Sequence, residues 1–215
     1  MSASRELILG RVRDALAGSA DAPTPPLRAY RRHGALERAA RIELLCERIG
    51  DYRAEVRRVG AAELAAAIAE AFAARGAARV CVPRAVPAHW RAPGLEWVED
   101  TQLPVDELDR VDGVLTGCTL AIAETGTIVL SAGPTEGRRA LTLLPDLHVC
   151  VVDEQQVVET VPEAMAALAD LVRVERRPLT FISGPSATSD IELSRVEGVH
   201  GPRQLIVLVL DKETA

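Results

Sequence analysis

Lysine is almost absent from this sequence of 215 residues. Its single lysine is Lys212, so chemistry that needs an interior amine, such as Schiff-base formation, is not expected. Aromatic residues make up only 3% of the chain, and the core must therefore be built mainly from Val, Leu, Ile and Ala. These small side chains predict close packing between the elements.

Cysteine is scarce and scattered. Between 31 and 36 residues separate successive cysteines, with no CxxC pair and no histidine at metal-binding spacing; the four are Cys46, Cys81, Cys118 and Cys150. We therefore expect no metal site and no cofactor on this chain. There is no GxGxxG or Walker pattern, no signal peptide and no apolar run near the ~20 residues of a membrane span. A cytoplasmic protein with reduced thiols is predicted.

Positive charge is in deficit, because the chain carries 25 basic against 31 acidic residues, a net charge of -6. This balance argues against general nucleic-acid binding, which needs a basic face. The charge is uneven: residues 1–60 carry 12 Arg against 8 acids, which leaves a net -10 for residues 61–215. A basic N-terminal segment on an acidic body suggests an arm that docks on its own body or on a neighbour, although a solvated helical face explains it as well.

The N-terminal part is predicted to be helical. Residues 3–17 place Leu7, Ile8, Val12 and Leu16 on one stripe of an amphipathic helix. The sequence GSADAPTPP at 18–26 reads as a linker, and a second helix is expected at about 35–50. We assign residues 1–52 to an N-terminal helical arm and linker, and residues 53–215 to an α/β domain.

From residue 53 onward, apolar strands alternate with helices. Strands are predicted at 54–59, 78–83, 96–98, 146–152, 179–182 and 204–210, and helices at 61–76, 104–112 and 161–171. Alternation of this kind is typical of a mostly parallel sheet with crossover helices. The run QLIVLVL at 204–210 is the best candidate for a central strand.

Two stretches carry the candidate site. Between two apolar runs of residues 113–132 lie Glu124, Thr125, Gly126 and Thr127. A carboxylate there must pair with an Arg or with backbone N–H groups, or face a cleft. The second stretch follows the strand at 179–182 with turn-forming and capping residues; its candidate ligand-binding members are Ser183, Gly184, Pro185, Ser186, Thr188, Asp190 and Gly201.

That second stretch has the composition of an anion site. Gly184 allows a close backbone approach, and Ser186, Thr188 and Asp190 are good helix N-caps, so free N–H groups would converge on a phosphate or carboxylate. The alternative is that these residues only cap and stiffen a turn. Because ligands of open α/β sheets gather at the carboxyl ends of the strands, we expect both stretches to lie on one cleft there.

The segments AETGTIVL (123–130), DLHVCVV (146–152), ISGPSATSDIE (182–192) and GVHGPRQL (198–205) resemble the lactate utilization protein C family, the LUD domain. The resemblance implies a Rossmann-like open, mostly parallel sheet, similar to the sugar-phosphate isomerase and CoA-transferase superfamily. It also implies a part in the oxidation of L-lactate to pyruvate, alongside partner proteins that carry iron–sulfur clusters.

Two residues are candidates for a catalytic role. Enzymes of the CoA-transferase group use a Glu nucleophile, which makes Glu124 a catalytic candidate by analogy of fold. His200, in the turn before the last strand, is a candidate acid or base, although a turn histidine also serves as a backbone hydrogen-bond partner. We expect His148, inside an apolar strand, to be core or cleft wall.

Three classes of function remain open. The first is an auxiliary or ligand-binding subunit of a lactate-oxidising system, with iron–sulfur subunits as partners. The second is a stand-alone enzyme that acts on a small carboxylate, phosphate or CoA ester through Glu124. The third is a regulatory small-molecule binder, and assembly into a homo-oligomer is compatible with all three.

Overall fold

A computed structural model of the chain describes residues 3–17, 27–188, 196–198 and 201–211. The chain divides into two units, Met1–Tyr30 and Arg31–Ala215, a division that falls before the predicted start of the α/β domain at residue 53. The first unit holds helix α1 (Ala3–Leu16), which confirms the helix predicted there and has no buried residue. Its apolar stripe is between 48% and 61% exposed. The predicted linker at 18–26 lies outside the described residues.

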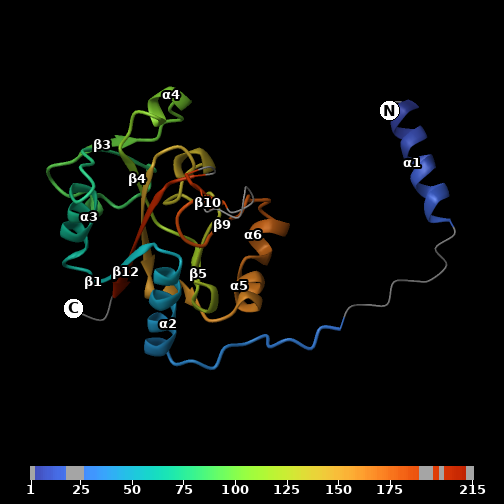
Figure 1. Ribbon diagram of the computed structural model, residues 1–215, viewed down its shortest axis with the longest axis horizontal. Coiled ribbons are helices and arrows are strands. Elements are labelled where there is room, and N and C mark those ends of the chain that lie inside the picture. The colour runs from blue at the N-terminus through green and yellow to red at the C-terminus, as the bar shows by residue number, and fades with distance from the viewer. Residues whose placement is uncertain (1–2, 18–26, 189–195, 199–200, 212–215) are drawn as a thin grey trace. The chain divides into compact units, whose positions relative to one another are not determined.

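The second unit is built on a parallel sheet of six strands (Figure 1). In the order in which they lie side by side, they are β1 (Glu55–Gly60), β12 (Gln204–Asp211), β7 (Leu147–Asp153), β4 (Gly113–Thr116), β2 (Arg79–Val82) and β3 (Glu96–Glu99). Every neighbouring pair runs parallel. The predicted parallel α/β arrangement is confirmed, and β12 takes the interior place expected for the run QLIVLVL.

The sequences of β7 and β12 explain why the sheet is covered on both faces. Apart from His148 near its start, β7 is apolar up to its last residue, and successive side chains point to opposite faces of a strand. Leu147, Val149 and Val151 pack on one face with helix α3 (Leu64–Ala73). Cys150 and Val152 pack on the other face with helix α2 (Arg38–Asp51). Both faces are therefore dry, and a polar side chain within β7 needs a partner.

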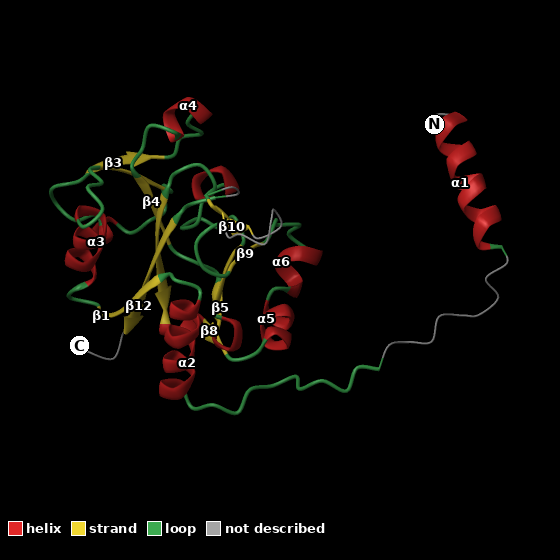
Figure 2. Ribbon diagram, viewed as in Figure 1, coloured by secondary structure: helices red, strands yellow, loops and turns green. Residues whose placement is uncertain are grey.

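A second, smaller sheet lies on the α2 side and was not predicted from the sequence. In order it contains β8 (Val157–Val158), β5 (Leu120–Ile122), β6 (Thr127–Leu130) and β9 (Thr180–Ile182) (Figure 2). Strand β5 pairs antiparallel with β6, and β6 antiparallel with β9, whereas β5 and β8 are parallel. Ala164 and Leu168 cover one side of this sheet; they belong to α5 (Val161–Ala167) and to its junction with α6 (Ala169–Arg173).

Short elements connect these layers. They are η1 (Ala88–Trp90), α4 (Val105–Leu108), η2 (Ala123–Thr125), η3 (Arg139–Thr142), η4 (Glu154–Gln156) and the two-stranded pair β10 (Ala187–Thr188) and β11 (Val196–Glu197). Helix α2, which the sequence assigned to the arm, buries Ile42, Leu45 and Ile49 against the large sheet and β5–β6. Within the described residues, no helix combines the length and apolarity that crossing a bilayer requires.

Candidate functional site

Glu124 lies in η2, the turn that joins β5 to β6. Gly126 closes the turn in the left-handed conformation, with φ of 59°, against the backbone of α2. A Cβ at this position would lie 2.6 Å from the carbonyl carbon of Arg48. The turn therefore needs glycine for two reasons, its positive φ and the close approach of a helix backbone.

We expect the replacement Gly126→Ala to lower the free energy of unfolding by about 2 kcal/mol, because alanine is strained at positive φ and its methyl group meets Arg48. Chemical unfolding followed by circular dichroism measures this change. The matched control is Gly50→Ala in α2, where an added Cβ meets no atom within 4 Å. That variant should keep or slightly raise stability, by up to about 1 kcal/mol. Equal stability of the two variants would contradict this account of the turn.

The Glu124 carboxylate forms an ion pair with an arginine, which was one of the alternatives inferred from the sequence. Its Oε1 accepts a hydrogen bond from Arg31 at 3.0 Å, and 48% of the side chain is exposed. The other nitrogen of Arg31 donates at 2.6 Å to Glu159, which is buried. The N–H of Leu36 also donates to Glu159, and this bond, more than the Arg31 bond, lowers the pKa of that carboxyl. Glu124 thus belongs to a charged cluster that fastens residues 31–36 to η2.

A chain of hydroxyl groups joins the two sequence stretches. Thr127 Oγ1 lies 2.8 Å from Thr125 Oγ1 and 2.8 Å from Ser183 Oγ. The contact exists because β6, which begins at Thr127, pairs with β9, which ends just before Ser183. The structure therefore brings the Glu124 turn and the Ser183 turn side by side.

The Ser183 turn differs from the predicted geometry. Gly184 has φ of 82° and packs against Tyr52, so this position also favours glycine. Ser186 donates its backbone N–H to the Pro202 carbonyl at 2.8 Å instead of leaving it free for a ligand. Ser186 is followed directly by strand β10, so the prediction that it caps a helix is wrong. Thr188 ends β10, and its predicted cap depends on residues 189–195, which the structure does not describe. Asp190 and His200 lie outside the described residues.

A cavity of about 310 Å³ opens beside the Ser183 turn. Five of the predicted residues line it, namely Ser183, Gly184, Pro185, Ser186 and Gly201. Glu124, Thr125, Gly126 and Thr127 do not line it, so the hydroxyl chain connects Glu124's turn to the cavity wall without placing Glu124 inside. We call this space the anion cavity, for the charge of its lining.

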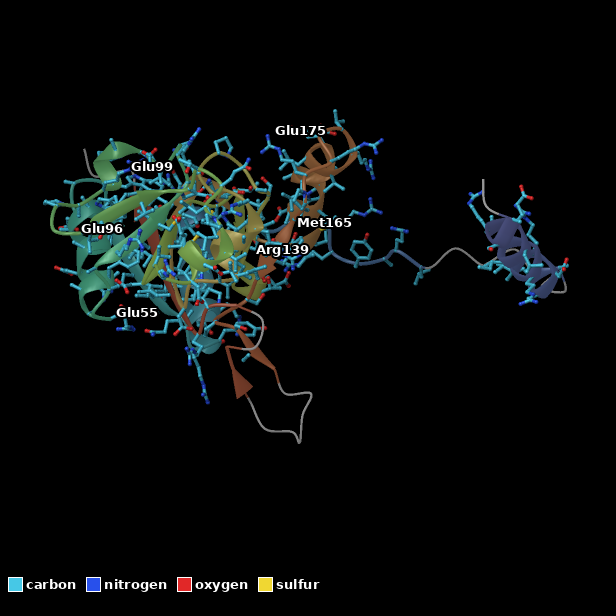
Figure 3. The ribbon with its side chains drawn as sticks, turned by 90° about the horizontal axis from the view of Figure 1, so that it is seen from above. Glu55, Glu96, Glu99, Arg139, Met165 and Glu175 are labelled. Atoms are coloured by element: carbon cyan, nitrogen blue, oxygen red, sulfur yellow. The ribbon has the colours of Figure 1, made fainter. Side chains whose placement is uncertain are left out.

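The anion cavity is lined by one guanidinium group and one imidazole ring and, among the described lining residues, by no carboxylate. The two are Arg139, at the start of η3, and His148 of β7. Arg139, labelled in Figure 3, is exposed and forms no ion pair with any described residue. Hydroxyl groups of Thr142, Thr180, Ser183 and Ser186 complete the polar lining. A cationic, hydroxyl-rich pocket of this size fits a small carboxylate or phosphate.

His148 is buried, with 1% of its surface exposed, and its Nε2 lies 2.8 Å from Thr116 Oγ1. The expectation that it is core or cleft wall is confirmed, because it lines the anion cavity. Its signal in the sequence was a titratable ring inside an otherwise apolar strand. Arg139 had a weaker signal, since nothing distinguished it from its neighbour Arg138. The structure separates the two: Arg138 is tied to Asp100 by hydrogen bonds of 2.8 and 3.1 Å.

The anion cavity lies at the opposite edge of the large sheet from the one expected. Its lining residues from the large sheet are His148 and Leu205, each the second residue of its strand, so it adjoins the amino ends of β7 and β12. The expectation assumed that all the strands belong to one parallel sheet. In fact β5 and β9, which lead to the two stretches, belong to the small mixed sheet. No three His, Cys, Asp or Glu side chains of the described ranges converge as metal ligands would.

Comparison with known proteins gives the family. The LUD domain matches residues 84–210. A lactate utilization protein C from Deinococcus radiodurans is 50% identical over 204 residues, which are 94% of this chain and 93% of that protein. Proteins of the same name from Shouchella clausii and Bacillus pumilus are 32% and 40% identical over 114 and 95 residues, about half or less of each protein.

A solved structure agrees with these matches. The crystal structure of a DUF162 family protein from Deinococcus radiodurans superimposes with a TM-score of 0.73 at 48% identity, and the match covers 82% of this chain and 100% of that one. The LUD domain match, residues 84–210, includes β7, all of β12 except its last residue, and the residues that line the anion cavity. The chain therefore belongs to the LUD domain family and is a homologue of lactate utilization protein C.

Proposed function

We propose that this chain is the ligand-binding subunit of a lactate utilization system, which oxidises L-lactate to pyruvate together with iron–sulfur partner proteins. The observation that carries the proposal is the near full-length similarity to a protein named for lactate utilization, 50% identical over 94% of this chain. The anion cavity supplies a site at which this chain would bind the acid. We also propose that the parallel sheet has the Rossmann-like arrangement of the sugar-phosphate isomerase and CoA-transferase superfamily.

A small 2-hydroxy or 2-oxo acid suits the anion cavity. The guanidinium of Arg139 can bind a carboxylate through two hydrogen bonds, and the nearby Thr142, Ser183 and Ser186 hydroxyls can bond either a hydroxyl or a carbonyl group. The apolar walls, Leu143 and Leu205 among them, accommodate a methyl group. In this proposal the chain holds and orients the acid by its carboxylate.

Electron transfer in this system requires a second protein. Removal of two electrons from a 2-hydroxy acid needs an acceptor, and the sequence carries neither a dinucleotide fingerprint nor the clustered cysteines that hold iron and sulfur. The iron–sulfur subunits supply the acceptor, and this chain supplies the binding site.

The test combines the purified chain with L-lactate and an artificial electron acceptor, with and without iron–sulfur partner proteins. No turnover is expected from the chain alone, and turnover is expected in the complete mixture. Omission of this chain from that mixture should abolish turnover. Turnover by the lone chain would instead support a stand-alone enzyme and make Glu124, half exposed beside two threonine hydroxyls, the residue to examine first.

A further inference from the structure

A second cavity lies at the carboxyl edge of the large sheet, whereas the anion cavity adjoins the amino ends of the strands. It measures about 290 Å³. Three neighbouring strands contribute to its wall: Gly117 directly follows β4, Asp153 ends β7, and Leu210 is the last but one residue of β12. The two cavities share no lining residue among those that the structure describes. The second cavity is therefore a separate site, which the sequence motifs did not indicate.

The course of the chain explains why a cavity forms there. After β2 the chain turns toward β3, and this connection lies on the α3 face of the sheet, where Trp90 packs. After β4, the neighbour of β2, it turns the other way, toward β7, through the small sheet on the α2 face, where Cys118 packs. Connections that diverge in this way open a crevice at the carboxyl ends of the strands, and ligands of open α/β sheets bind in such crevices. Both connections line the second cavity.

Two aromatic rings form one corner of the second cavity. His89 and Trp90, in η1, line it with ring planes at 88° to each other and centroids 6.4 Å apart. The indole of Trp90 reaches the end of β4, because a Cβ added at Gly117 would lie 3.8 Å from its Cη2 atom and 2.9 Å from Thr135 Oγ1. Glycine at position 117 therefore keeps the space between the indole and this hydroxyl group open.

The charge of the second cavity is opposite to that of the anion cavity. Among its described lining residues there is one carboxylate, that of Asp153, and no arginine or lysine. Oδ1 of Asp153 accepts the N–H of Gln155, which fixes the side chain at the start of η4. The side-chain amide of Gln156 is engaged at both ends, by the N–H of Asp153 and by the Cys118 carbonyl. The remaining wall is mainly apolar and includes Pro87, Val151 and Leu210.

We propose that the second cavity binds a small organic ammonium ion. A cation is attracted to the faces of aromatic rings, and rings set at an angle contact it on two sides, as in the aromatic cages that recognise quaternary ammonium groups. A primary ammonium group has three donors to satisfy, and this lining has few acceptors to offer. An alkylated ammonium group suits it better, because its methyl groups pack on the apolar wall while its charge faces Asp153. The proposal does not depend on lactate or on the anion cavity.

The experiment titrates the full chain with choline and, separately, with its neutral isostere dimethylbutanol, in which a carbon atom replaces the nitrogen. Calorimetry measures the affinity, and the indole N–H resonances of the two tryptophans, Trp90 and Trp97, report the place of binding. We expect choline to bind with a Kd of about 1 mM or below, and dimethylbutanol to bind about tenfold more weakly. Choline should shift the resonance of Trp90 more than that of Trp97, whose Nε1 donates to the Ala92 carbonyl.

Matched variants test the carboxylate and the indole separately. Asp153→Asn keeps an oxygen that can accept the same backbone N–H but removes the charge, so it should weaken choline binding about tenfold and leave dimethylbutanol binding unchanged. The control Asp112→Asn removes the same charge from a side chain that also accepts backbone N–H groups but lies outside the cavity, and binding should not change. Trp90→Leu should weaken choline binding about 2- to 30-fold, and Trp90→Phe should restore part of the loss.

Three results would overturn the proposal. One is equal binding of choline and dimethylbutanol, which would show an apolar pocket without preference for charge. Another is no shift of the Trp90 resonance at tenfold the expected Kd. The third is an Asp153→Asn protein that binds choline as tightly as the Asp112→Asn protein, with native-like circular dichroism in both. Arg139→Met should leave choline binding unchanged, so the failure of this proposal and the failure of the proposed function are distinguishable.

Discussion

Replacement of Glu136 by Gln should lower the free energy of unfolding by about 3 kcal/mol, the largest stability loss expected from a change of one charge in this chain. Glu136 is 4% exposed. Its Oε2 accepts the N–H of Ser131 at 2.5 Å and the N–H of Gly133 at 2.9 Å, and its Oε1 accepts the Thr119 hydroxyl at 2.5 Å. The amide of Gln keeps the shape but turns one acceptor into a donor, which then faces a donor.

The loop geometry explains why this carboxylate matters. Ala132, between the two N–H groups that Glu136 binds, has φ of 54°, a strained conformation for a residue with a side chain. The carboxylate compensates that strain and holds the loop that leads to η3 and Arg139. Loss of the carboxylate should therefore also loosen the rim of the anion cavity.

The control for Glu136 is Glu96→Gln on the edge strand β3, labelled in Figure 3. Glu96 pairs with Arg79 at 3.0 Å, but its side chain is 66% exposed. Exposed ion pairs contribute little, so this variant should change stability by less than about 1 kcal/mol. Urea unfolding of both variants measures the difference. A Glu136→Gln protein as stable as the Glu96→Gln protein would contradict the role given to the buried carboxylate.

Local sequence patterns predicted most helices and the strands of the large sheet, because the burial of apolar side chains sets those patterns. The apolar runs of β7 and β12 place apolar side chains on both faces of the strand. This pattern is typical of interior strands in a sheet that is covered on both faces. Helix α2 was predicted from Leu36, Ala39, Ile42, Leu45 and Ile49 at helical spacing. Ile42, Leu45 and Ile49 pack inward as predicted, whereas Leu36 and Ala39 are exposed. Each of these patterns lies within a single helix or strand, so one sequence is enough to detect it.

The pairing of strands that are distant in the sequence could not be predicted in the same way. The apolar runs at 120–123 and 128–130 and the run at 179–182 resemble the strands of the large sheet, and nothing within their sequences indicates that they pair with each other. Consequently the small sheet was missed, and the candidate site was placed at the wrong sheet edge. The two stretches were expected to lie on one cleft. They do lie side by side, with Thr127 in contact with Ser183, but residues 124–127 do not line the anion cavity.

The ion pairs of the structure distinguish between candidate ligand-binding residues, and the sequence alone does not show which residues form these pairs. Glu124 and Arg139 both occupy polar turns between apolar segments. In the structure Glu124 is bound by Arg31, which is also bound by buried Glu159. Arg139 faces a cavity whose described lining contains no carboxylate. The residue favoured by analogy of fold is therefore already ion-paired, and the residue with no motif offers the positive charge that an anionic ligand needs.

Replacement of Arg139 by Met should weaken the binding of L-lactate, pyruvate or inorganic phosphate by about 10- to 100-fold, the loss of a charge-assisted bidentate contact. Methionine keeps most of the apolar stem, so the cavity wall is preserved while the charge is removed. Calorimetric or NMR titration of the purified chain with each of the three probes measures the change. Wild-type binding should weaken as salt is added, because the rim of the cavity is exposed and its charge is screened.

Two further variants make the Arg139 result specific. Arg84→Met removes an exposed arginine that does not line the anion cavity, and binding should be unchanged. Glu124→Gln should leave the dissociation constants within about twofold, because Glu124 lies outside the cavity and removal of its charge frees only one of the two contacts of Arg31. If Glu124→Gln abolished lactate turnover in the complete mixture while Arg139→Met bound and reacted normally, the site would have to be moved to the η2 turn. If Arg139→Met lost binding and turnover together, then the cation at the amino edge of the sheet would be the group that selects the acid.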